Sequence, residues 1–142
     1  MSDLETAKRE LPGHTICLCR DGDCIYSDRK GIAPMMGFMA EGMELGGYSA
    51  ADLIVGKAAA LLFVRSGIVS VFAKVLSEKG KDILEKYGVY FEYETLTDKI
   101  VSRDGTDICP MEKTVSGTDS PDEAYELLLD KIRLMNTGKA ER

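Results

Sequence analysis

Few side chains in this sequence have the chemistry for catalysis or for metal binding. There is one histidine, so a catalytic relay or a metal site built on histidine would have to use His14 alone. Three of the four cysteines, Cys17, Cys19 and Cys24, flank a single Asp-Gly turn. A thiolate metal site needs three or four converging ligands, and the other candidates are distant in sequence. We therefore expect free thiols at ordinary strand positions, with no metal site and no cofactor.

A single lysine interrupts the most apolar part of the chain, "SAADLIVGKAAALLF" from Ser49 to Phe63. The pattern predicts one buried helix that begins with a capping box at Ser49 and ends before Gly67. Lys57 lies at the middle of this helix and has no carboxylate three or four residues away. One interpretation is that its ammonium reaches the surface along the apolar stem. The other is that it points into a cleft, where it binds an anionic ligand or acts as a catalytic base or nucleophile.

The segment "CPMEK" contains a second set of reactive groups. Pro110 suits the first turn of a helix and places Cys109 at the N-cap, where the helix dipole favours the thiolate. Cys109 is then a candidate nucleophile, and Glu112 is its candidate acid/base partner. The alternatives are a small buried cysteine at the end of a strand and a carboxylate that the dipole favours in the first turn.

Two further segments are candidate parts of a binding site. Gly46, Gly47, Tyr48 and Ser49 lead into the expected helix and form a candidate anion-binding loop at its N-terminus. A methionine-rich segment before them either lines an adaptable apolar pocket or fills the core. Its methionines are Met35, Met36, Met39 and Met43.

The composition limits the classes of partner. The chain has 142 residues, a net charge of −6, 44% hydrophobic and 30% charged residues, as one globular domain does. There is no Lys/Arg cluster to contact phosphates, so we expect no nucleic-acid binding. The longest apolar run, 58–64, is too short to span a bilayer, and the charged N-terminus lacks the apolar region of a signal peptide. We therefore expect a cytoplasmic protein with no membrane partner.

Strands alternate with helices along the chain, which predicts an α/β protein with a mixed sheet covered by helices in α-β-α layers. We expect a single domain over residues 1–142, with a polar tail at 136–142. Tight turns are expected at Asp21-Gly22 and Asp104-Gly105. Helices are expected at 2–11, 34–42, 49–66, 77–87 and 120–135, and strands at 14–20, 24–27, 68–76 and 89–95.

The local sequence also resembles a known family. "GYSAADLIVGKAAALLFV", "VFAKVLSEKGKDILEKYGV" and "DICPMEKTV" resemble an uncharacterised prokaryotic family, a domain of unknown function grouped with the cytidine deaminase superfamily. The resemblance covers nearly the whole chain, and "VGKAAALL" together with "CPMEK" is its most specific part. It implies the cytidine-deaminase-like fold. Members of that superfamily often assemble into dimers or larger oligomers, so a homo-oligomer is expected as well.

Zinc deaminases of this superfamily use His-x-Glu or Cys-x-Glu on one core helix and Pro-Cys-x-x-Cys on the next. Here Lys57-Ala58-Ala59 stands where the first motif is expected, and "LSEKG" at 76–80 contains no cysteine. The metal ligands and the proton-shuttling glutamate are therefore missing. The resemblance implies a zinc-less relative in which one fixed lysine charge replaces a metal cation.

The leading hypothesis is a deaminase-like domain that binds a small, anionic, nucleotide-like ligand and is not a zinc-dependent deaminase. Lys57, Cys109, Glu112 and the loop at 46–49 would line its cleft. One alternative is a metal-independent enzyme that acts on a small metabolite through Cys109 or Lys57. Another is a structural or regulatory subunit without a ligand, which would be marked by an exposed apolar patch.

Overall fold

The computed structural model describes residues 2–101 and 107–140, of which 137–140 are described by their backbone alone. The helices are α1 (Asp3–Glu10), α2 (Ala33–Ala40), α3 (Lys57–Ser66), α4 (Glu78–Lys86), α5 (Pro110–Thr114) and α6 (Pro121–Ala140). The strands are β1 (Ile16–Arg20), β2 (Asp23–Ser27), β3 (Ser49–Val55), β4 (Ser70–Ser77) and β5 (Tyr90–Thr97).

The strands form one mixed sheet in the order β2-β1-β3-β4-β5. β1 is antiparallel to both β2 and β3, whereas β3, β4 and β5 are parallel. Each parallel pair is joined by a helix, α3 or α4, because parallel neighbours need a crossover connection. The layered α/β class that the sequence predicts is confirmed.

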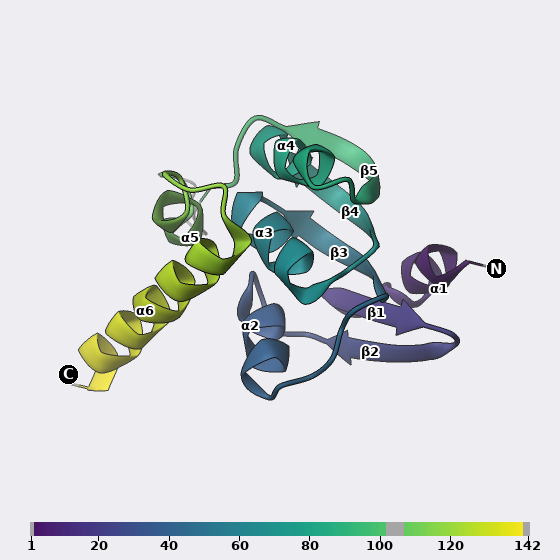
Figure 1. The fold of residues 1–142 in the computed structure, drawn as a ribbon, viewed down its shortest axis with the longest axis horizontal. Helices are drawn as coiled ribbons and strands as arrows, with labels where there is room; N and C mark the ends of the chain where they lie inside the picture. The colour runs from purple at the N-terminus through teal and green to yellow at the C-terminus, as the bar shows by residue number, and fades with distance from the viewer. Residues whose placement is uncertain (1, 102–106, 141–142) are drawn as a thin grey trace.

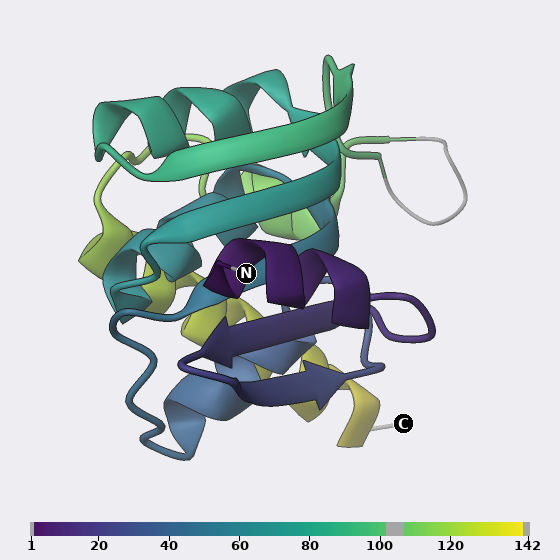
Figure 2. The same cartoon turned by 90° about the vertical axis from the view of Figure 1, so that its right-hand side faces the viewer.

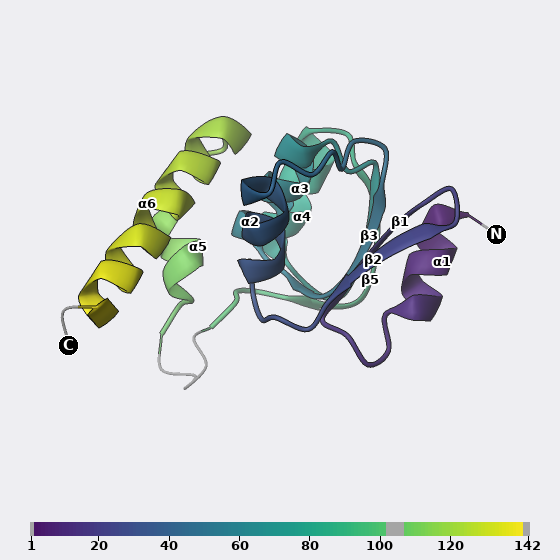
Figure 3. The ribbon, with the colours of Figure 1, turned by 90° about the horizontal axis from the view of Figure 1, so that it is seen from below.

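The helices cover the two faces of the sheet unequally. Only α1 lies on one face (Figure 2), whereas α2, α3 and α4 lie on the other (Figure 3). α5 and α6 form a further layer that contacts α3, and α6 extends beyond the rest of the molecule (Figure 1). Of the described helices, none is long and apolar enough to cross a membrane.

The helix caps and the tight turn that the sequence predicts are present in the structure. The Ser2 side chain accepts a hydrogen bond from the Glu5 N–H at 3.1 Å at the start of α1, and the Ser120 side chain does the same for α6. Asp21 and Gly22 both have positive φ angles, 51° and 88°, as the tight turn between β1 and β2 requires. These capping and turn predictions are confirmed.

The expected helix at 49–66 is wrong over its first half. Ser49–Val55 is strand β3, which lies between β1 and β4 and is hydrogen-bonded to both. A central strand buried on both faces is almost continuously apolar, so its sequence cannot be told from a buried helix by periodicity. Gly56 separates the two elements as the N-cap of α3. Lys57 is therefore the first residue of a helix and not the middle of one.

The C-terminal half differs from expectation at two places. α6 continues to Ala140 through the segment assigned to a polar tail. The turn expected at Asp104-Gly105 lies outside the described residues, although an antiparallel bridge joins Val101 to Ile108.

The core has two parts, one on each face of the sheet. The larger part fills the space between the sheet and the helices α2, α3, α4 and α6, and Met35 and Met36 are buried in it. Met39 and Met43 are partly buried and pack against it, so the core-filling interpretation of the methionines is confirmed. The smaller part lies under α1 and contains Cys17 and Cys19 among its buried residues.

Asp52 is a buried carboxyl in the centre of the sheet. It is 7% exposed and is paired laterally with Ile16 of β1 and Ala73 of β4. Both of these neighbours belong to the larger core, so Asp52 projects to the same face. The Ile54 N–H donates to its Oδ1 at a long 3.5 Å. Burial raises the pKa of Asp52 from 3.8 to about 8, so the carboxyl is mainly protonated at neutral pH.

The raised pKa predicts a specific pH dependence of stability. Between pH 4 and pH 8 the folded chain holds a proton on Asp52 that the unfolded chain releases. Stability therefore falls as the pH rises through this window and levels off above it. We expect Asp52→Asn to be more stable than the wild type at pH 8, by a few kcal/mol at most, and similar to it at pH 4. Urea unfolding at several pH values measures this difference; parallel stability curves for the two proteins would contradict the prediction.

Candidate functional site

A pocket lies where the parallel strands end and the next helices begin. The carboxyl ends of β3 and β4 meet here, next to the first turns of α3 and α4 and next to α5. In open α/β sheets this is the edge at which ligands usually bind. The pocket encloses about 190 Å³.

The wall of this pocket carries more positive than negative charge. Four lysines line it, Lys57, Lys79, Lys99 and Lys113, together with two carboxylates, Asp98 and Glu112. Within the described part of the chain, the ammonium groups of two of these lysines, at 79 and 99, form no hydrogen bond or ion pair. We name this cavity, defined by its four lysines, the lysine pocket.

Lys57 is held by groups that lie far from it in sequence. Its side chain is 9% exposed, and Nζ lies 3.0 Å from Oδ1 of Asp119 and donates to the Ser116 carbonyl oxygen at 3.3 Å. The hydrogen bond and the charge of Lys57, with a further contribution from Lys86, hold the pKa of Asp119 below its ordinary value. The partner carboxylate thus comes from the segment before α6 and not from the helix of Lys57. The Lys57 side chain lines the lysine pocket and also a second hollow that Asp119 borders, and it is almost fully buried.

Glu112 caps helix α3. Its Oε1 accepts the Lys57 N–H and its Oε2 accepts the Ala58 N–H, both at 2.8 Å. A helix N-terminus attracts anions because its first N–H groups have no partner within the helix. In this chain its own carboxylate fills that position. A Cβ on Gly56 would lie 2.3 Å from Oε1, so glycine is required there for the approach.

Cys109 lies at the N-cap of α5, as predicted, but it does not line the lysine pocket. Its thiol borders an apolar groove between α2, α5 and α6 and a small hollow that it shares with Glu112 and Gly56. Glu112 therefore lies between the two candidate reactive groups, Lys57 and Cys109, without placing them in one cavity. The catalytic roles of all three residues stay predictions.

The loop at 46–49 lies at the other end of β3. Ser49 begins that strand, and its hydroxyl is 2.6 Å from the hydroxyl of Ser70. The carbonyl of Gly46 accepts from Arg20 Nη1 at 2.8 Å, and the Gly47 N–H donates to the Gly67 carbonyl. Because a strand and not a helix follows, the helix N-terminus expected beside Gly46, Gly47 and Ser49 is absent. The predicted ligand-binding residues are thus divided between two ends of the sheet.

Three lysines of the pocket were missed by the sequence analysis: Lys79, Lys99 and Lys113. They come from α4, from the segment after β5 and from α5, so nothing in their spacing joins them. One feature of the sequence could have indicated this edge of the sheet: Ser77, an N-cap residue that directly follows an apolar strand. Its side chain accepts the Gly80 N–H at 2.9 Å and marks the start of a helix at the same sheet edge.

The expectation of four free thiols is wrong. Cys19 and Cys24 form a disulfide across the β1–β2 hairpin, because the antiparallel register places them opposite each other with Cα atoms 4.2 Å apart. Cys17 and Cys109 are free. Burial, with a smaller contribution from Glu10, raises the pKa of the Cys17 thiol to about 11.

The cap formed by Glu112 predicts a loss of stability on its removal. Glu112→Ala deletes the acceptor of two helix N–H groups and should lower the free energy of unfolding by about 1–3 kcal/mol. Glu112→Gln retains one oxygen acceptor and should lose less. Glu85→Ala in α4 is the control, since Glu85 is exposed. Urea unfolding compares the three; a Glu112→Ala loss no larger than that of the control would refute the capping role.

The comparisons with known proteins agree with this fold. The family model TM1506, a domain of unknown function (DUF1893), matches residues 8–132. The crystal structure of the DUF1893 family protein TM1506 from Thermotoga maritima is similar over 92% of this chain and 91% of that chain, with a TM-score of 0.83 and 25% identity. No curated protein matches the sequence. The expectation of a family of unknown function is confirmed, while the wider deaminase relationship stays a prediction. The chain belongs to the DUF1893 family.

Proposed function

We propose that this protein binds a small anionic ligand in the lysine pocket. The observation that carries the proposal is the presence of two ammonium groups in the pocket wall, on Lys79 and Lys99, that form no described hydrogen bond or ion pair. The charge of Lys99 acts on Asp107, which is itself paired with Lys113. Lys57 and Lys113 are already paired with Asp119 and Asp107, which leaves Lys79 and Lys99 as the lysines of the pocket wall that an anion could pair with. An anion in this pocket would pair with these lysines and would find Lys57 already fixed by Asp119.

The size of the pocket narrows the class of ligand. Its volume of about 190 Å³ lies below the roughly 300–1,000 Å³ of cavities that enclose drug-sized molecules. A phosphorylated or carboxylated metabolite of the size of a sugar phosphate fits this volume better than a complete nucleotide does. A nucleotide-like ligand, which the deaminase resemblance suggests, would place its phosphate inside and leave the rest at the mouth.

The proposal does not include zinc-dependent deamination. The resemblance expects a histidine and a glutamate at the positions of Lys57 and Ala59, and neither residue offers the required ligand or proton shuttle. Lys57 lies at the start of α3 and lines the lysine pocket. In our proposal it is a fixed part of the pocket wall, held by its ion pair with Asp119, while Lys79 and Lys99 supply the charge that pairs with the anion.

The lysine pocket gives a direct ligand-binding prediction. Inorganic phosphate, ribose 5-phosphate and cytidine monophosphate should be compared by thermal shift and titration calorimetry. We expect at least one of them to stabilise the wild type and to bind at least about tenfold more weakly to Lys79→Ala/Lys99→Ala, because the two ammonium groups that form no ion pair are lost.

Lys74→Ala is the matched control, since Lys74 is an exposed lysine of β4 that borders a different cavity. The lysine-pocket proposal fails if none of the three anions binds. It also fails if the double variant binds as tightly as the control does.

A second candidate function, that of a self-associating subunit, is favoured by the groove beside Cys109. This groove of about 680 Å³ lies between α2, α5 and α6, and its lining is mostly apolar, with Met36, Met111 and Ile132 among its residues. Met135 of α6, which lines this groove, is 41% exposed. An exposed apolar surface of this kind commonly marks an interaction site, and we propose a second copy of the chain as the partner.

Self-association predicts a mass that depends on protein concentration. Sedimentation velocity should show dimers or larger species for the wild type, and Met135→Asp, in the groove, should shift them toward the monomer, because a buried carboxylate in the contact is unfavourable. Val69→Asp, at another exposed apolar position, is the control and should behave as the wild type. A wild type that stays monomeric at high concentration would exclude this function.

A further inference from the structure

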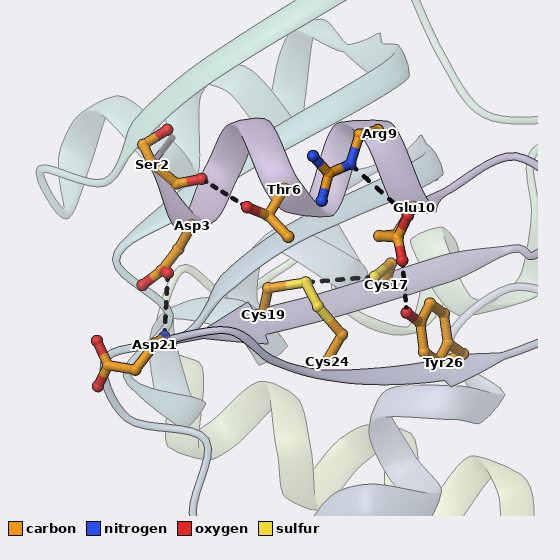
Figure 4. The surroundings of a disulfide bond; sticks show 10 residues. All are labelled: Ser2, Asp3, Thr6, Arg9, Glu10, Cys17, Cys19, Asp21, Cys24 and Tyr26. Atoms are coloured by element: carbon orange, nitrogen blue, oxygen red, sulfur yellow. Dashed lines mark hydrogen bonds and ion pairs between the residues drawn. A yellow bond between two sulfur atoms is a disulfide. The ribbon is translucent and has the colours of Figure 1, made fainter.

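Three sulfur atoms converge under helix α1, at a place separate from the lysine pocket. Sγ of Cys17 lies 3.5 Å from Sγ of Cys19, which is bonded to Cys24, and all three sulfurs lie within 4.8 Å of one another (Figure 4). A disulfide that only fastens the hairpin needs two cysteines. The disulfide therefore does not account for the position of the Cys17 sulfur beside it.

On the face of the sheet that α1 covers, these sulfurs are surrounded mainly by buried apolar side chains. Cys17 and Cys19 are fully buried in the same apolar cluster as Leu4, Leu11 and Phe72. Cys24 is only partly buried, and it lies on β2, the edge strand of the sheet. The cluster thus has a shielded interior and one sulfur that is accessible from outside.

We propose that, when the Cys19–Cys24 disulfide is reduced, the three cysteine sulfurs bind one soft monovalent cation of the copper(I) class. A dithiol reductant transfers two electrons and two protons to the disulfide and leaves as a cyclic disulfide, which gives three thiols. Copper(I) then replaces the three thiol protons and forms three copper–sulfur bonds. The protons leave to solvent.

The spacing of the sulfurs fits trigonal coordination. A metal–sulfur bond of about 2.3 Å places the sulfurs of a planar three-coordinate site about 4 Å apart. The 3.5 Å contact between Cys17 and Cys19 lies just below this value, and no two of the three sulfurs are more than 4.8 Å apart. The sulfurs of Cys19 and Cys24, which are bonded to each other, must move apart when the disulfide opens, and rotation of their side chains can supply this movement.

The number and type of ligands select the metal class. Thiolates are soft donors that favour copper(I), whereas structural zinc is almost always bound by four ligands. In the described part of the chain, the group of potential ligands at this place consists of the three cysteines alone. Access to the metal is through Cys24, the partly exposed ligand.

The test uses the full chain in a Cys109→Ser background, so that the fourth thiol cannot contribute. The reduced protein is titrated anaerobically with copper(I) against a chromophoric copper(I) chelator, and sulfur-to-copper charge transfer is followed in the near ultraviolet. We expect one equivalent of copper(I) on the reduced protein and none on the oxidised protein. Cys17→Ser keeps both hairpin cysteines and should weaken binding by roughly tenfold or more.

The possible outcomes separate this site from a purely structural disulfide. No copper(I) bound by the reduced protein would overturn the proposal. Equal affinity of the wild type and Cys17→Ser would overturn it too, since two thiols would then suffice. Loss of the far-ultraviolet circular dichroism on reduction would have the same consequence, because the site requires an intact hairpin.

Discussion

The contact between Glu112 and the N-terminus of α3 is the interaction on which this end of the molecule depends. It joins α5 to the junction between β3 and α3 through two hydrogen bonds of 2.8 Å. The contact is sterically possible because Gly56 has no side chain. A carboxylate at this position satisfies N–H groups that have no partner within the helix and interacts favourably with the helix dipole. The same contact keeps α5 beside the lysine pocket, which α5 helps to line.

A second close approach completes this end of the sheet. A Cβ on Gly80 would lie 3.0 Å from the backbone of Gly56, so the first turn of α4 packs directly on the start of α3. The N-termini of α3 and α4 and the four lysines of the lysine pocket therefore lie close together, although the protein as a whole is acidic. One N-terminus is neutralised by Glu112, and Lys57 is neutralised by Asp119. Lys79 and Lys99 form no described hydrogen bond or ion pair, and the proposed anion site rests on these two ammonium groups.

The two faces of the sheet have different chemistry. The helix-rich face holds the larger core, the protonated Asp52 and the lysine pocket at its edge, whereas the face under α1 holds the sulfur cluster. The disulfide joins only neighbouring strands of one hairpin. Its reduction leaves the parallel part of the sheet, and therefore the lysine pocket, with all of its pairings. The proposed anion site and the proposed copper(I) site are accordingly independent.

The sequence by itself determined the elements that rest on short local signals. Ser2 and Ser120 accept hydrogen bonds from N–H groups three residues away, and Asp21-Gly22 forms a turn between neighbouring strands. The position of Cys109 before Pro110 likewise follows from local helix geometry. These interactions span a few residues, so their partners can be read from spacing along the chain.

Only the tertiary structure decided the identity of β3 and the partners of Lys57. Most of Ser49–Val55 is buried and apolar, so no regular polar face shows its period, and pairing with β1 and β4 makes it a strand. The carboxylates of Glu112 and Asp119 reach α3 from segments far along the chain, and no spacing rule connects such residues. The sequence determines which residues are charged and where helices are capped. The order of the strands in the sheet determines which of these charged residues come into contact.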